Sequence, residues 1–170
     1  MTPILGEGLP EHPPRCAVAV ARFHQDITEA LLEGCLQGLQ EQGAEPREVT
    51  VARVPGAWEL PLACDRLAAS RRYDAVIALG CVVRGETPHF DYVAGECARG
   101  LQEVALRRGL PVVFGVLTTD TLEQARWRAD RDCLRGSDPG SAGAKQTPRC
   151  NKGYEAAAAA LQMVRLLEQI

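Results

Sequence analysis

The segment Gly80–Tyr92 (GCVVRGETPHFDY) holds the densest set of residues whose types and spacing could do chemistry. It follows the apolar run Ala75–Leu79, so it would begin at the carboxyl end of a strand, where ligands gather in parallel α/β sheets. Thr87 is a favourable N-cap and Pro88 a favourable first helical residue, which predicts a helix start. The free backbone N–H groups of such a start form an anion site that suits phosphate.

His89 would lie in the first turn of that helix, beside the anion site. An imidazole in this position could act as a general acid or base near neutral pH. Gly85 would let the backbone approach a ligand closely. The simpler interpretation is that Thr-Pro-His only starts a helix and leaves His89 exposed, and spacing alone leaves both interpretations open.

Two other loops that follow apolar runs carry candidate binding residues. Phe23 could stack on a flat heterocycle, or it could be a core residue beneath the next helix. Glu59 could accept hydrogen bonds from sugar hydroxyls or a ring N–H, or it could be an acid that a helix start favours.

Short motifs of several common enzyme classes are absent from the sequence. It contains no GxxxxGK[ST], GxGxxG, GxSxG or HExxH pattern. This argues against ATP hydrolysis, dinucleotide binding and the common hydrolase and zinc-protease designs.

Four short β-rich runs predict the strands that would position these loops: Cys16–Ala21, Val49–Val54, Ala75–Leu79 and Pro111–Leu117. The first, third and fourth are nearly continuous in apolar character, as in a parallel sheet covered on both faces. The second is half-polar and suits a less buried position. Ile4 and Leu5 could add a short N-terminal edge strand.

Helical patterns lie between and after these runs. Apolar spacing and end signals predict helices over about Asp26–Gln42, Trp58–Ser70, Pro88–Arg108, Asp120–Ala129 and Gly153–Glu168. This alternation predicts an α/β fold, a three-layer α/β/α sandwich with a mostly parallel, flavodoxin-like four-stranded sheet. The 170 residues fit a single domain spanning 1–170. Residues 129–150 have no period and are expected to form an irregular inserted loop.

Composition argues against several kinds of partner and site. The net charge of -3 argues against nucleic acid, and every apolar run is too short to cross a membrane. The N-terminus lacks the pattern of a secretion signal, so a cytoplasmic location is expected. The seven cysteines are odd in number and form no close pair, so we expect reduced thiols. The three histidines are too scattered to predict a metal site.

Four motifs in the same order resemble the 6,7-dimethyl-8-ribityllumazine synthase family: Val54–Pro61 (VPGAWELP), Gly80–Tyr92, Phe114–Ala125 (FGVLTTDTLEQA) and Asn151–Ala157 (NKGYEAA). The resemblance covers the chain from about residue 15 to residue 167, apart from 129–150. It implies condensation of 5-amino-6-(D-ribitylamino)uracil with 3,4-dihydroxy-2-butanone 4-phosphate, releasing phosphate and two waters. This is the penultimate step of riboflavin biosynthesis, and the family uses no metal or organic cofactor.

The resemblance also implies roles for individual residues. Those that would hold the pyrimidine and its ribityl chain are Phe23, Ala57, Trp58, Glu59, Val82 and Val83. Among them, Phe23 would stack on the uracil ring and Glu59 would bind hydroxyls. The phosphate would meet Gly85, Glu86 and Thr87. His89 would move protons during imine formation and phosphate loss.

A second group would reach the site from a neighbouring subunit. These residues are Phe114, Arg128 and Lys152; Arg128 would bind phosphate and Lys152 would add a second positive charge. The resemblance therefore implies a homo-oligomer, with a pentamer as the basic unit and active sites between subunits. Some members form hollow shells, and some of those associate with riboflavin synthase.

Three positions depart from the family pattern. His24 stands where Asn is usual, and Cys81 is a milder change. Residues 129–150 replace a link of only a handful of residues between Arg128 and Asn151. Because that link lies near contacts between pentamers in shell-forming members, the hypothesis is a pentamer or a pair of pentamers.

Two other functions compete with the synthase. One is a non-catalytic or altered relative that binds flavin or lumazine, or that forms a shell. The other is an unrelated α/β phosphosugar enzyme that uses the anion site between Gly85 and His89. The latter would leave the remaining motifs as coincidence.

Overall fold

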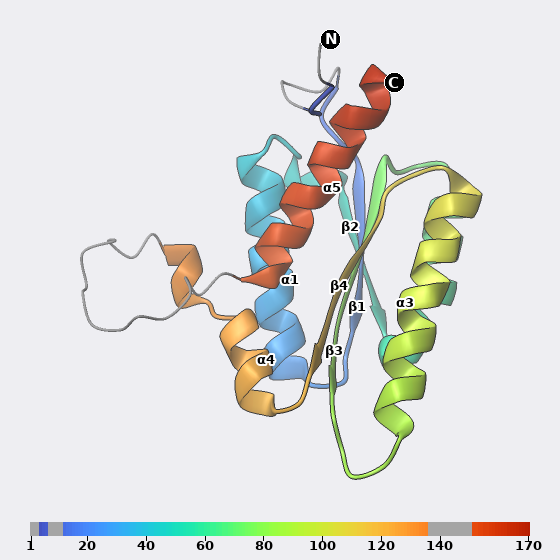
Figure 1. Cartoon of the computed structure of the whole chain (residues 1–170). Helices are drawn as coiled ribbons and strands as arrows, with labels where there is room; N and C mark the ends of the chain where they lie inside the picture. Colours follow the sequence, from blue (N-terminus) through green and yellow to red (C-terminus); the bar gives the residue numbers. More distant parts are fainter. Residues whose placement is uncertain (1–3, 7–11, 136–150) are drawn as a thin grey trace.

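A four-stranded parallel sheet forms the centre of the computed structural model, which describes residues 4–6, 12–135 and 151–170 (Figure 1). Its strands are β1 (Cys16–Ala21), β2 (Val49–Val54), β3 (Ala75–Val83) and β4 (Val112–Thr119). Their spatial order is β2-β1-β3-β4, and every neighbouring pair is parallel. The predicted flavodoxin-like topology is confirmed. The third strand is longer than predicted and includes Val82 and Val83.

Helices cover both faces of this sheet, as the three-layer prediction requires. They are α1 (Gln25–Glu41), α2 (Leu60–Ala69), α3 (His89–Arg108), α4 (Leu122–Arg128) and α5 (Lys152–Gln169). Short 3-10 turns occupy Pro46–Glu48, Ala57–Glu59 and Asp132–Arg135. In Figure 1, α1, α4 and α5 lie on one side of the sheet and α3 on the other.

Side chains that alternate along the central strands fill two cores. Val18 and Ile77 pack beneath α1 and α5, where Leu31 and Leu161 are fully buried. The opposite core is built from alanines of β1, such as Ala19, packed against residues of α2 and α3. β1 is therefore buried on both faces, which explains its continuous apolar sequence.

The two edge strands differ in a way that their sequences only partly anticipate. β2 is half-exposed, as its polar residues predict. β4 is apolar in sequence but also forms an edge, and Phe114 on it is 41% exposed. An apolar strand at an open edge offers both backbone groups and side chains to another chain.

The suggested N-terminal edge strand is wrong for the residues that the structure describes there. Ile4 and Leu5 are half-exposed and lie beside α5 instead of joining the sheet. The carbonyl of Leu5 accepts a hydrogen bond from Gln162 Nε2 at 3.3 Å. A strand needs a ladder of backbone partners, and this side-chain contact supplies only one bond.

The beginning of the inserted segment is more regular than predicted. Arg131 donates two hydrogen bonds to the carboxylate of Glu33, at 2.6 and 3.0 Å. Gln37 Nε2 then donates to the carbonyl of Leu134 at 3.1 Å, within the turn Asp132–Arg135. The segment is thus held against α1 as far as this turn, whereas residues 136–150 lie outside the described part of the chain.

Close packing of α1 against α5 generates the first testable prediction. A Cβ at Gly153 would overlap the backbone carbonyl of Leu31, so Gly153→Ala should destabilise the protein by about 1–3 kcal/mol. Urea unfolding measures the change. Gly95→Ala is the matched control, because a Cβ there meets no atom of the described residues within 4 Å. Equal urea midpoints for the two variants would contradict the packing argument.

Candidate active site

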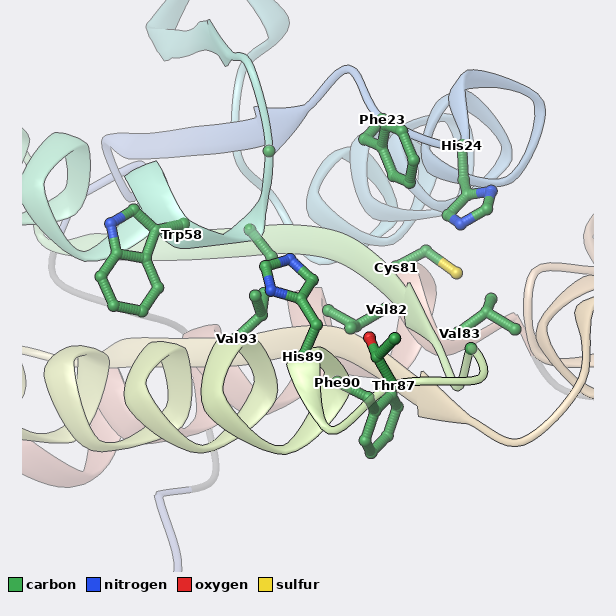
Figure 2. Close-up of a pocket in the computed structure, with 13 residues that line it drawn as sticks. Phe23, His24, Trp58, Cys81, Val82, Val83, Thr87, His89, Phe90 and Val93 are labelled. Carbon is green, nitrogen blue, oxygen red and sulfur yellow. The ribbon is translucent and has the colours of Figure 1, made fainter.

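A cavity of about 320 Å³ opens where the carboxyl ends of β1, β2 and β3 meet (Figure 2). It lies at the point where the order of strands reverses, which is where ligands bind in open α/β sheets. Its wall is mostly apolar and aromatic, with a few polar groups. The lining residues are Phe23, His24, Gly56, Ala57, Trp58, Cys81, Val82, Val83, Gly85, Thr87, His89, Phe90 and Val93.

The wall after β1 presents an aromatic ring to solvent. The N–H of Phe23 donates to the carbonyl of Pro55 at 3.1 Å, which ties this loop to the one after β2. Phe23 is 67% exposed, so the alternative of a core residue is wrong. The ring of His24 meets it edge to face, with centroids 4.6 Å apart. His24 turns the chain into α1 with a left-handed backbone, a conformation that His and Asn adopt more readily than most residues.

The wall after β2 combines a buried turn with a second exposed aromatic residue. Ala57 is buried, whereas Trp58 is 58% exposed. Glu59 Oε2 accepts a hydrogen bond from the N–H of Gly56 at 2.9 Å. Glu59 thus stabilises its own turn, as the simpler interpretation predicted, and it is not among the residues that line the cavity.

The helix start after β3 differs by one residue from the prediction. Pro88 is the N-cap, α3 begins at His89, and Thr87 makes no capping hydrogen bond. The reason is that Asp91 N–H bonds to the Pro88 carbonyl, which makes Pro88 the boundary residue. Thr87 therefore keeps its hydroxyl free of a capping role, and Figure 2 shows it beside the cavity. The same view shows the imidazole of His89 pointing away from α3 into the cavity.

Arg84 fixes the loop between β3 and α3, a role that the sequence analysis missed. Its guanidinium pairs with Asp91 and with Asp120, each at 3.2 Å, and lies 4.1 Å from the ring centre of Phe90. These contacts link the end of β4 to the start of α3. An arginine close to acidic residues at a strand end could have indicated an ion pair here. No spacing rule, however, identifies Asp91 and Asp120 as the partners of Arg84.

Cys81 contributes an apolar wall to the cavity. Its side chain is buried, and burial raises the pKa of the thiol to about 12. The thiol therefore stays protonated at neutral pH. Burial likewise raises the pKa of the free cysteines Cys16, Cys35 and Cys64 to about 12.

A second cavity, of about 350 Å³, lies along the open edge of β4. Phe114, Arg128 and Lys152 all line it, together with residues of β4 and α5. Arg128 Nη1 donates to the carbonyl of Gln124 at 3.0 Å, and Lys152 Nζ pairs with Glu155 at 2.6 Å. Among the residues that the structure describes, none lines both cavities.

The predicted site residues thus fall into two groups. Most of them line the first cavity, the three assigned to a neighbouring subunit line the second, and Glu59 and Glu86 line neither. Sequence reasoning did not select Gly56, Phe90 or Val93. Gly56 and Phe90 lay inside quoted motifs, so their neighbours could have drawn attention to them. In the described part of the chain, no group of three or more His, Cys, Asp or Glu could hold a metal ion.

Comparison with known proteins decides among the competing functions. The model of the family described as 6,7-dimethyl-8-ribityllumazine synthase matches residues 13–168. A relative of that name from Thermus thermophilus is 51% identical over 156 residues, which cover 92% of this chain and 89% of the relative. The chain belongs to the 6,7-dimethyl-8-ribityllumazine synthase family.

Membership in the lumazine synthase family makes the chain an enzyme, a transferase of riboflavin biosynthesis. The comparisons give no support to the alternative of a non-catalytic relative. The described helices include none that is both long and apolar enough to span a membrane.

The exposed ring of Phe23 generates a prediction about binding. Phe23→Ala should weaken binding of 6,7-dimethyl-8-ribityllumazine about tenfold, because stacking and apolar contact are lost. Thermal stability should change little, since the ring is 67% exposed. Fluorescence titration measures the dissociation constant. Leu106→Ala removes another exposed apolar side chain, outside the cavity, and should bind as the unaltered protein does. Unchanged affinity in Phe23→Ala would rule out a stacking role.

Proposed function

We propose that the cavity beside His89 holds the ribitylaminouracil and that a neighbouring subunit completes the site with its own Arg128 and Lys152. Lumazine synthases condense this pyrimidine with 3,4-dihydroxy-2-butanone 4-phosphate to give 6,7-dimethyl-8-ribityllumazine, phosphate and two waters. The observation that carries the proposal is the separation of the two groups of site residues into two cavities of one chain. The first cavity has the aromatic residues and His89, and the second has the two cations that would bind phosphate.

Binding of the pyrimidine is assigned to the apolar part of the first cavity. Phe23 would stack on the ring, and Val82 and Val83 would frame it at the end of β3. Ala57 and Trp58 would line the path of the ribityl chain. The exposure of Phe23 and Trp58 in the single chain supports this assignment, because it leaves both aromatic faces available.

Binding of the phosphate is assigned to the loop before α3 together with a neighbouring cation. Gly85, Glu86 and Thr87 would meet the phosphate through the backbone and a hydroxyl. Within the described part of the chain, a Cβ at Gly85 would meet no atom within 4 Å, so open space beside this backbone is available to a ligand. Arg128 of the neighbouring subunit would supply a charge-assisted hydrogen bond, and its Lys152 a second positive charge.

The chemistry then requires mainly positioning and proton transfer. The amino group of the pyrimidine attacks the ketone carbon, and loss of water gives an imine. Elimination breaks the carbon–oxygen bond to phosphate, and ring closure expels the second water. His89 would move protons in these steps, since its imidazole points into the cavity (Figure 2). Holding the two reactants together supplies much of the remaining rate.

Glu59 would have two roles, one in stabilising its own turn and one in binding the ribityl chain. Its carboxylate already accepts the N–H of Gly56 through Oε2, which fixes the side chain beside the turn. A carboxylate has further acceptor capacity in its other oxygen, so Glu59 can also accept a ribityl hydroxyl. Glu59 would therefore bind the sugar chain from a preorganised position.

Oligomeric assembly follows from the open edge of β4. Phe114 is exposed on that edge, beside Arg128 and Lys152. We assign this surface to the contact with the next subunit. Such a contact pairs two different surfaces head to tail, and repeated contacts of this kind close into a ring. A pentamer is the proposed ring, in a cytoplasmic enzyme; the buried, protonated thiols fit a reducing compartment. A direct binding assay would test association with riboflavin synthase.

Mixing two inactive variants tests the shared site. His89→Ala and Arg128→Ala should each lose most activity, measured as lumazine and phosphate formed above the uncatalysed condensation. Subunits exchanged between the two variants should recover about one quarter of the sites, because only some interfaces pair an intact His89 with an intact neighbouring Arg128. No recovery, from exchanged and correctly assembled oligomers, would mean that the two residues act within one chain.

Particle size tests the proposed assembly. Static light scattering should give the mass of a pentamer or of two pentamers, because residues 129–150 lengthen the link that shell-forming members keep short. Replacement of residues 132–150 by three glycines is the control for the effect of the insertion. A particle of shell mass in the unaltered protein would contradict the proposal.

A further inference from the structure

Asn151 is the most completely bonded buried polar side chain at the junction of α1 and α5. It is only 1% exposed. Its Oδ1 accepts from the N–H groups of Gly153 and Tyr154, at 2.9 and 3.3 Å, and so caps α5. Its Nδ2 donates to the carbonyls of Ala30 and Asp130, at 3.0 and 3.4 Å. One amide therefore uses both donor hydrogens and both acceptor positions.

These bonds connect three separate parts of the chain. Ala30 belongs to α1, Asp130 lies just before the inserted turn, and the capped N–H groups begin α5. The bond to Asp130 therefore joins the start of the insertion to the residue that follows it. Although a long segment intervenes in the sequence, the chain leaves and returns at nearly the same place.

The two cations of the second cavity lie on either side of this junction. Arg128 is the last residue of α4, close in sequence to Asp130, and Lys152 is the first residue of α5, next to Asn151. Both line the cavity at the edge of β4. Their relative position depends on how residues 130 and 151 are held, because the covalent link between them is long.

Close helix packing leaves Asn151 little freedom. A Cβ at Gly34 would collide with the amide of Asn151, and a Cβ at Gly153 would collide with the backbone of α1. Glycine at both positions lets α5 begin directly against α1, with the amide enclosed between them. The side chain of Asn151 is therefore held in one position between the two helices.

We propose that Asn151 is a positioning residue that holds Arg128 and Lys152 together at the site completed by the neighbouring subunit. In this chain the amide bonds to Asp130 and caps α5, so it connects the two backbones that carry these cations. The proposal rests on the function proposed above, because it assigns those cations to the phosphate-bearing substrate. Asn151 itself lines neither cavity, so its effect is transmitted through the backbone at Asp130 and at the start of α5.

The test separates the bond across the insertion from the helix cap. Asn151→Ser keeps a favourable N-cap but removes both donors to Ala30 and Asp130. We expect the KM for the butanone phosphate to rise about tenfold, since a small misplacement of a binding group is costly. The KM for the pyrimidine should stay unchanged, because its cavity is formed by other residues. Steady-state kinetics on the assembled enzyme measures both constants.

Two further variants exclude a general loss of stability. Leu161→Ala removes a fully buried side chain of α5 away from both cavities, and should lower stability without raising the KM for the phosphate substrate. Replacing residues 132–150 by three glycines in the Asn151→Ser protein should restore that KM, because a short covalent link replaces the missing bond. A merely structural role would not be rescued in this way.

Contrary outcomes are distinct. An unchanged KM in an assembled Asn151→Ser enzyme, an equal rise for both substrates, or a failed rescue would each overturn the positioning role. If Arg128→Ala also leaves the KM for the phosphate substrate unchanged, the proposed function fails as well. If Arg128→Ala raises it and Asn151→Ser does not, only the role of Asn151 is lost.

Discussion

The candidate site depends on one topological constraint, namely that the chain leaves β1 and β3 toward opposite faces of the sheet. α1 follows β1 on one face, and α3 follows β3 on the other (Figure 1). The two neighbouring strand ends therefore diverge and leave a crevice between their loops. Because of this divergence the crevice is lined by residues of both loops: Phe23, His24, Cys81, Val82, Val83, Gly85, Thr87 and His89. Arg84 then stabilises the longer of the two loops through Asp91 and Asp120.

The same sheet explains why the proposed site is divided between two chains. β4 ends the sheet with an apolar edge and an exposed Phe114, and two cations flank that edge. The described residues that line the cavity at the strand ends include aromatic rings and two imidazoles, but no arginine or lysine. A phosphate-bearing substrate needs positive charge, and the second cavity has it. In the proposed site, assembly of subunits thus brings positive charge to the substrate and also covers an apolar edge.

The insertion between α4 and α5 is compatible with this arrangement because its ends are held together. Arg131 pairs with Glu33, and Asn151 bonds to Asp130, so both sides are fixed to or beside α1. A long surface connection adds little to the entropy of loop closure once its ends are held. The family chemistry can therefore be retained despite a marked departure in sequence.

The sequence by itself determined the strands, the helices and most of the residues that line the first cavity. Continuous apolar runs and helical spacing are local signals, and the loops after strands were identified from them, including Phe23 and His89. The position of Thr87 as a cap was wrong by one residue, because a local preference for Thr as a cap does not decide which carbonyl starts the helix. The Ile4–Leu5 strand was wrong because a strand needs a neighbour, which local sequence does not supply.

Only the tertiary structure decided which of these residues meet. It gave Glu59 a bond within its own turn, and it placed Arg84 between Asp91 and Asp120. It also paired Asn151 with Asp130 across the insertion, which no spacing rule predicts. The physical reason is that periodicity reports which face of an element is buried, whereas contacts between distant residues depend on how the elements pack.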